Sequence, residues 1–166
     1  MNEQVFKSLP DNSKVWIYQS NRELSDGEVN QLHSLIKEFI QQWTSHSRKV
    51  IADGVVIYNR FIVLAADESA FTVSGCSVDS LVGFIKRLEQ QFNIHLFDRF
   101  SIAYRENGLI KTAAQSAFQH LVDNGDVTQD TMVFNNLVAT VKDFRESWEI
   151  PISKSWHGKF FKVQVH

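Results

Sequence analysis

The chain has 166 residues, 43% hydrophobic and 22% charged, so it is long enough to bury a sizeable core and is neither fibrous nor disordered in composition. Its 17 basic and 19 acidic residues give a net charge of -2 and form no long basic run, which argues against nucleic-acid binding. The single cysteine excludes an intramolecular disulfide and a multi-cysteine zinc site, and it fits a reducing, cytoplasmic compartment.

The sequence predicts neither a signal peptide nor a membrane span. Residues 1–4 contain no basic residue, and no apolar stretch of the signal-peptide kind follows them. No stretch approaches the roughly 18 apolar residues that a membrane helix requires. We therefore expect a cytoplasmic protein without membrane insertion.

The chain shows no internal repeat and no obvious linker, since its prolines lie only at Pro10 and Pro151. This pattern predicts a single α+β domain over residues 1–166, with peripheral segments at 1–13 and 150–166. We expect a mostly antiparallel sheet, two long amphipathic helices and a helical, aromatic C-terminal segment.

In the first part of the chain, residues 15–18 form a short β-rich run that predicts the first strand. Ser25 and Glu28 have the spacing of a capping box, and apolar residues then repeat at helical spacing at Val29, Leu32, Ile36, Phe39 and Trp43. Asp53-Gly54 predicts a tight turn. Residues 61–65 follow another turn, at 59–60, and are apolar on both faces, which predicts a central strand.

A second amphipathic helix is predicted up to residue 92, with one face made of Val78, Leu81, Val82, Ile85, Leu88 and Phe92. Alternating Phe100, Ile102 and Tyr104 lead through Asn107-Gly108 into residues 109–110, which predicts an edge hairpin.

Residues 114–121 predict a short third helix that ends near Asn124-Gly125. Residues 131–137 fit either a strand or the entry into a helix over 138–148. The tail contains Trp156, Phe160 and Phe161 and is expected to pack back onto the domain.

Four small residues precede the second predicted helix: Ser74, Gly75, Cys76 and Ser77. Unpaired N–H groups and the helix dipole favour negative charge at such a place, either a bound anion or a thiolate. Cys76 is then a candidate nucleophile, with His46 or His157 as its base. Asp79 would oppose a second negative charge there. This favours the alternative of a capped turn with Cys76 half-buried.

Three arginines next to predicted strand ends are candidate anion ligands: Arg22, Arg60 and Arg99. Their guanidinium groups suit carboxylate or phosphate. The alternative is ordinary surface pairing with acidic neighbours, namely Glu23, Asp67 and Asp98.

Metal and cofactor sites are not predicted. The six histidines include no pair three or four residues apart, so helical ligand spacing is absent. The tryptophans Trp43, Trp148 and Trp156 and the thirteen phenylalanines predict core packing in preference to an aromatic ligand pocket.

Five strings in combination resemble an uncharacterised family of small bacterial cytoplasmic proteins that often carry the label "ABC transporter ATPase". They are VWIYQS at 15–20, YNRFI at 58–62, SGCSVDS at 74–80, VFNNL at 133–137 and SWH at 155–157. The likeness extends to about Phe161. It implies a small cytoplasmic protein without an established activity, and therefore no catalytic residues to carry over.

ATPase activity is not expected in spite of that label. Gly158-Lys159 superficially matches the end of a P-loop, but Phe160 stands where Ser or Thr is required and no glycine stands five residues before Gly158. The sequence favours a non-catalytic module that binds a protein partner or a small anionic ligand near Cys76. A thiol-dependent enzyme using Cys76 is the second hypothesis, and a homodimer built on an edge strand or on the aromatic tail is the third.

Overall fold

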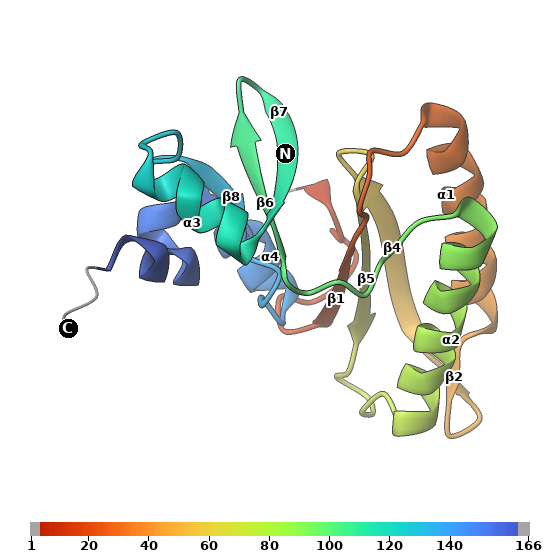
Figure 1. The fold of residues 1–166 in the computed structure, drawn as a ribbon. Coiled ribbons are helices and arrows are strands. Elements are labelled where there is room, and N and C mark those ends of the chain that lie inside the picture. The colour runs from red at the N-terminus through yellow and green to blue at the C-terminus, as the bar shows by residue number, and fades with distance from the viewer. Residues whose placement is uncertain (1–3, 163–166) are drawn as a thin grey trace. The chain divides into compact units, whose positions relative to one another are not determined.

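The computed structural model describes residues 4–162, and the chain divides into two compact units (Figure 1). Unit 1 consists of Met1–Asp98 and Ala139–Arg145, and unit 2 consists of Arg99–Val138 and Glu146–His166. Each unit has its own antiparallel sheet and at least one helix. The α+β class is therefore confirmed. The expected organisation as one domain with two peripheral segments stays a prediction.

The sheet of unit 1 contains β1 (Lys14–Gln19), β5 (Phe61–Asp67) and β4 (Ile51–Ile57), in that order. β5 is the central strand, and its residues 61–66 are all 0% exposed. Successive side chains of a strand point to opposite faces, so both faces of β5 are covered. The predicted central strand is confirmed.

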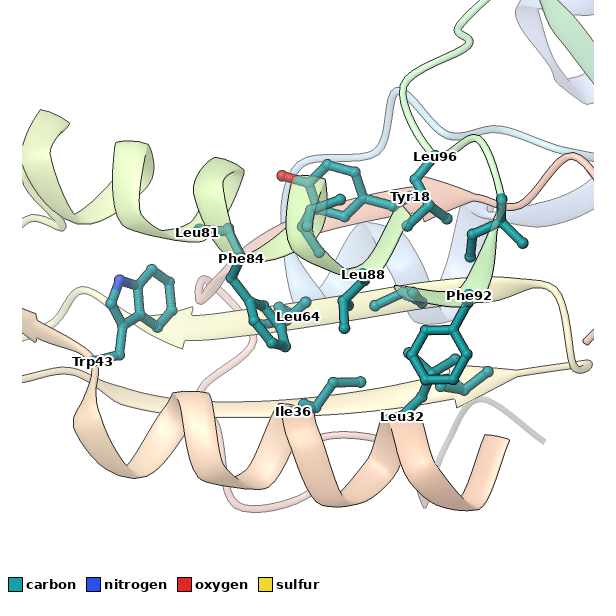
Figure 2. Packing of buried hydrophobic residues seen from close by; sticks show 14 of the residues in the cluster. Tyr18, Leu32, Ile36, Trp43, Leu64, Leu81, Phe84, Leu88, Phe92 and Leu96 are labelled. Carbon is teal, nitrogen blue, oxygen red and sulfur yellow. The ribbon is translucent and has the colours of Figure 1, made fainter. Parts of the chain in front are cut away.

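The two long helices of unit 1, α1 (Asp26–Gln42) and α2 (Gly75–Phe92), lie on the same face of this sheet (Figure 1). The predicted capping box starts α1: Ser25 Oγ accepts the N–H of Glu28 at 3.1 Å, and the Glu28 carboxylate accepts that of Ser25 at 3.0 Å. The rings of Phe39 and Phe84 stack at 4.4 Å and join the helices. Figure 2 shows apolar side chains of both helices pointing toward one another, among them Leu32, Ile36, Leu81, Leu88 and Phe92.

The prediction of a turn at Asp53-Gly54 is wrong, because both residues lie inside β4. Glycine is required there by close packing: a Cβ added to Gly54 would lie 2.5 Å from Cγ2 of Ile36 on α1. The chain reverses after β4 instead, at Tyr58 and Asn59, whose φ angles are 55° and 53°. The Asp-Gly pair thus marks where a helix crosses the sheet.

Unit 2 contains a sheet in the order β7-β6-β8-β9. Its strands are β6 (Ser101–Glu106), β7 (Leu109–Ala114), β8 (Met132–Phe134) and β9 (Glu149–Pro151). Asn107 and Gly108 have φ angles of 52° and 77° and form the predicted hairpin turn. Phe100, expected to alternate inward with Ile102 and Tyr104, is 74% exposed because β6 begins only at Ser101.

The third predicted helix is confirmed as α3 (Gln115–Asp123), and it ends before Gly125, whose φ is 77°. The choice left open for residues 131–137 is settled by β8, after which α4 (Val141–Ser147) forms the next helix. The tail contains the 3-10 helices η2 (Ile152–Lys154) and η3 (Trp156–Phe161). Its aromatic residues pack against the core of unit 2, as predicted.

The hairpin of β2 (Thr44–Ser45) and β3 (Arg48–Lys49) follows α1 and belongs to unit 1. Trp43 precedes it and is 2% exposed, and Trp148 is 0% exposed. Each indole N–H has a partner: that of Trp43 donates to the carbonyl oxygen of Ser77, and that of Trp148 to Oδ1 of Asn136. These two tryptophans are core residues, as the sequence indicates.

Replacing Gly54 with alanine tests the close contact between α1 and β4. The added methyl group must push Ile36 away, so Gly54→Ala should lower the free energy of unfolding by about 1 to 3 kcal/mol in urea denaturation. Gly83→Ala is the matched control, because its Cβ would only approach the Arg87 side chain, at 3.8 Å. That change should raise the free energy of unfolding by about 0.5 to 1 kcal/mol through helix propensity. Equal effects of the two changes would contradict the packing account.

Candidate functional site

The N-terminal turn of α2 carries the four small residues that the sequence indicated. Ser74 is the N-cap, and its Oγ accepts the N–H of Ser77 at 3.2 Å. Gly75 and Cys76 are exposed and begin the helix. Helix geometry leaves their N–H groups without an intrahelical acceptor. The turn therefore presents two outward backbone donors next to a thiol.

The β2–β3 hairpin holds this turn in place. Ser45 Oγ accepts the N–H of Ser74 at 2.9 Å, and the Trp43 indole donates to the carbonyl oxygen of Ser77 at 2.9 Å. The Ser77 hydroxyl donates to the carbonyl oxygen of Thr44. Ser45 and Ser77 are 1% and 2% exposed. Figure 1 shows the hairpin beside the beginning of α2. The start of the helix is thus fixed by contacts that the sequence did not reveal.

This turn differs from the expectation in two respects, the position of Asp79 and the exposure of Cys76. Asp79 is the fifth residue of α2, and the first turn contains no acidic residue. Because the helix dipole acts mainly within the first turn, Asp79 opposes an anion less than its sequence distance suggested. Cys76 is exposed, and the expectation that it would be half-buried is wrong.

The hairpin that holds the turn also carries a basic side chain, Arg48. Arg48 pairs with Ser45 across the hairpin, and directly opposed residues share one face. Since Ser45 contacts Ser74, Arg48 lies on the face of the hairpin toward α2. Its guanidinium carbon is 4.3 Å from the ring centroid of Phe71, which precedes the turn.

The two predicted bases lie in different units. His46 is exposed at the tip of the β2–β3 hairpin, with a φ of 51°. His157 belongs to unit 2 and is 1% exposed. Its Nδ1 lies 2.6 Å from Oγ of Ser155, and its ring stacks on Trp156 at 3.8 Å. Within unit 1, the structure joins the hairpin of His46 to the turn of Cys76.

Arg22 forms a clamp between the two long helices. Its guanidinium donates to both carboxylate oxygens of Glu28, at 2.9 and 2.8 Å, and to the carbonyl oxygen of Phe92 at 2.7 Å. It thus joins the beginning of α1 to the end of α2. The expected acidic partner was Glu23, whose backbone oxygen is a further acceptor at 3.2 Å. Nothing in the sequence indicates that Glu28 serves both the capping box and this ion pair.

Arg60 and Arg99 have different surroundings. Arg60 follows the β4–β5 turn and donates to the carbonyl oxygen of Asn21 at 3.3 Å. Burial lowers its pKa, and the charge of Glu23 partly opposes this effect. Arg99 is exposed at the first position of unit 2. Arg22 and Arg60 are therefore both associated with residues 21–23, and a joint role with Arg99 in anion binding stays a prediction.

The ion pair of Arg22 predicts an acid-dependent loss of stability. Hydrogen bonds from Arg22, and then from Ser25, lower the pKa of Glu28 from 4.5 to about 2. The stabilisation is complete above pH 4.5 and is lost as the pH falls toward 2, because the unfolded chain takes up its proton first. Glu28→Gln should flatten this part of the pH profile of urea unfolding. Glu38→Gln, an exposed site on the same helix, is the control and should leave the profile unchanged.

The buried imidazole predicts a second pH dependence. Burial, and then the charge of Lys159, lowers the pKa of His157 from 6.5 to about 4. Folding therefore favours the neutral ring, and its contribution is complete above pH 6.5 and lost as the pH falls through 4. The change amounts to up to about 3 kcal/mol. His157→Asn keeps a polar atom for Ser155 but does not titrate, so it should reduce this slope. An unchanged slope, or a ring that titrates near 6.5 by NMR, would contradict the prediction.

Comparison with known protein families, curated proteins and solved structures found no match for this chain. The family resemblance of the five strings therefore stays a prediction. Among residues 4–162, no helix is both long enough and apolar enough to span a membrane. The same residues contain no group of three or more His, Cys, Asp or Glu side chains arranged to hold a metal ion. The case for a function thus depends on the geometry of the α2 turn.

Proposed function

We propose that this protein is a non-catalytic α+β binding module whose ligand carries a negative charge and docks on the N-terminal turn of α2. The observation that carries the proposal is that Gly75 and Cys76 are exposed in a first turn without acidic residues, beside a hairpin that bears Arg48. Backbone donors at a helix start, a helix dipole and a guanidinium are a recurrent combination for binding phosphate or carboxylate. The ligand is a small anion or an anionic group on a partner protein.

Rigidity of the turn supports this role. Ser45 and Trp43 fix the backbone at Ser74 and Ser77, so the N–H groups between them are oriented before a ligand arrives. Donors that are already oriented lose little entropy on binding. The proposal therefore requires no rearrangement of unit 1.

The predicted arginine ligands take a secondary place in the proposal. Arg22 already serves Glu28 and the carbonyl oxygen of Phe92, so we assign it to holding the helices together. Arg60 and Arg99 are kept as a separate anion-binding hypothesis. The single cysteine and the family resemblance support a cytoplasmic protein, and the missing P-loop speaks against an ATPase. Homodimerisation stays a prediction that a solution mass measurement tests.

Gly75 allows one backbone donor of the proposed site to be deleted. Proline suits the first position of a helix and lacks an N–H, and the extended conformation of Ser74 (φ -69°, ψ 161°) accepts a following proline. Gly75→Pro should weaken binding of inorganic phosphate about fivefold to tenfold in calorimetric titration, as expected for a charge-assisted hydrogen bond. Gly75→Ala keeps the N–H and adds a methyl group into open space, so its affinity should match that of the wild type.

The guanidinium is tested in the same titration by a charge-matched pair of variants. Arg48→Ala should weaken phosphate binding, whereas Lys86→Ala, at an exposed position further along α2, should leave it within about twofold because screening weakens distant charges. Equal affinities of Gly75→Pro and Gly75→Ala, or of Arg48→Ala and Lys86→Ala, would contradict the proposed site.

A thiol-dependent enzyme is the second candidate function. It is favoured by the exposure of Cys76 and by the attachment of the His46 hairpin to the same turn. The pH profile of Cys76 alkylation by iodoacetamide separates the two functions. For a binding module, we expect the same profile in wild type, His46→Ala and His157→Ala. Loss of reactivity near neutral pH in His46→Ala alone would instead favour the enzyme.

A further inference from the structure

Side chains accept two of the outward N–H groups at the outer edge of β4. β4 is the last strand of the sheet of unit 1, and an antiparallel strand directs alternate N–H groups to each side. Gly54 and Val56 are two residues apart, and both donate their N–H to side chains. Asp53 Oδ1 accepts that of Gly54 at 2.8 Å, and His33 Nε2 accepts that of Val56 at 3.1 Å. Unpaired edge donors invite pairing with other strands, so closing them protects the sheet.

His33 reaches β4 because α1 lies unusually close to the strand. Gly54 has no side chain, and Ile36, three residues after His33, occupies the space where a Cβ would stand. Residues three apart lie on neighbouring positions of one helix face. The packing of Ile36 on Gly54 therefore sets the distance at which His33 meets Val56. The His33 side chain is itself exposed, so water can deliver a proton to it.

The direction of this hydrogen bond fixes the state of the imidazole. A backbone N–H can only donate, so Nε2 of His33 must be an acceptor. The neutral ring then carries its hydrogen on Nδ1. A second proton would bind at Nε2 and place two donors against each other, and the bond to Val56 would be lost.

We propose that His33 is a pH-sensitive latch that closes the edge of β4: the neutral imidazole accepts the Val56 N–H, and protonation of the ring releases it. The device goes beyond the proposed ligand site, from which it is independent. Protonation of the ring leaves the packing of α1 on Gly54 in place and removes the acceptor of one edge donor, the N–H of Val56.

Four charged residues lie on the elements that carry His33 and Val56 or follow them directly. On α1, Asp26 and Lys37 lie on the same stripe as His33, seven residues before it and four after it. β4 contributes Asp53, whose carboxylate accepts the N–H of Gly54. The turn after β4 contributes Arg60, which donates to the carbonyl oxygen of Asn21.

Amide exchange at Val56 tests the latch directly. NMR-detected exchange with water, corrected for the intrinsic dependence on pH, is followed together with the ring signals of His33. In wild type, protection of the Val56 amide should fall about fivefold as the His33 ring becomes protonated, the effect of losing one hydrogen bond. The Gly54 amide should not follow the titration of the ring, because its acceptor is a carboxylate.

Two variants complete the test without affecting the core, since His33 is exposed. His33→Gln retains an acceptor that does not titrate, so Val56 should stay protected throughout. His33→Ala removes the acceptor, so Val56 should be weakly protected at every pH. If the exchange protection of the Val56 amide in wild type does not change as the His33 ring is protonated, the proposal is overturned. The same holds if His33 carries its neutral hydrogen on Nε2, or if His33→Ala protects Val56 as well as wild type does.

Discussion

Complete burial of residues 61–66 of β5 is the constraint on which the structure of unit 1 depends. A strand covered on both faces needs a layer on each side, and α1 and α2 provide one of them (Figure 2). The contact of Ile36 with Gly54 brings α1 against β4, and the stacking of Phe39 on Phe84 places α2 beside α1. The position of α2, and therefore of its first turn, follows from this packing.

α2 is then fastened at both ends by polar contacts. Ser45 and Trp43 hold its beginning, and Arg22 donates to the carbonyl oxygen of Phe92 at its end. Because Arg22 also pairs with Glu28, the end of α2 is joined to the beginning of α1. A helix fixed in this way presents the N–H groups of its first turn in one orientation. This is the physical basis for assigning a binding role to the turn.

Local patterns predicted much of the fold, and contacts between distant residues explain the rest. The capping box and the apolar run of β5 could be predicted because each depends on residues that are close together in the sequence. Asp53-Gly54 and Asn107-Gly108 look alike in sequence, yet only the second forms a turn. No residue near Gly54 in the sequence indicates that Ile36 of α1 packs against it. Likewise, the small residues before α2 were visible, but the hairpin that holds them was not.

Mapping the bound anion over the whole backbone tests the central claim most directly. Inorganic phosphate is added to the ¹⁵N-labelled protein, and the shift of every assigned amide is followed. If the α2 turn is the site, the largest shifts will fall on residues 74–77 and on the hairpin at 44–49. Shifts concentrated on residues 20–24 and the turn at 58–60 would place the anion at Arg22 and Arg60 and contradict the account.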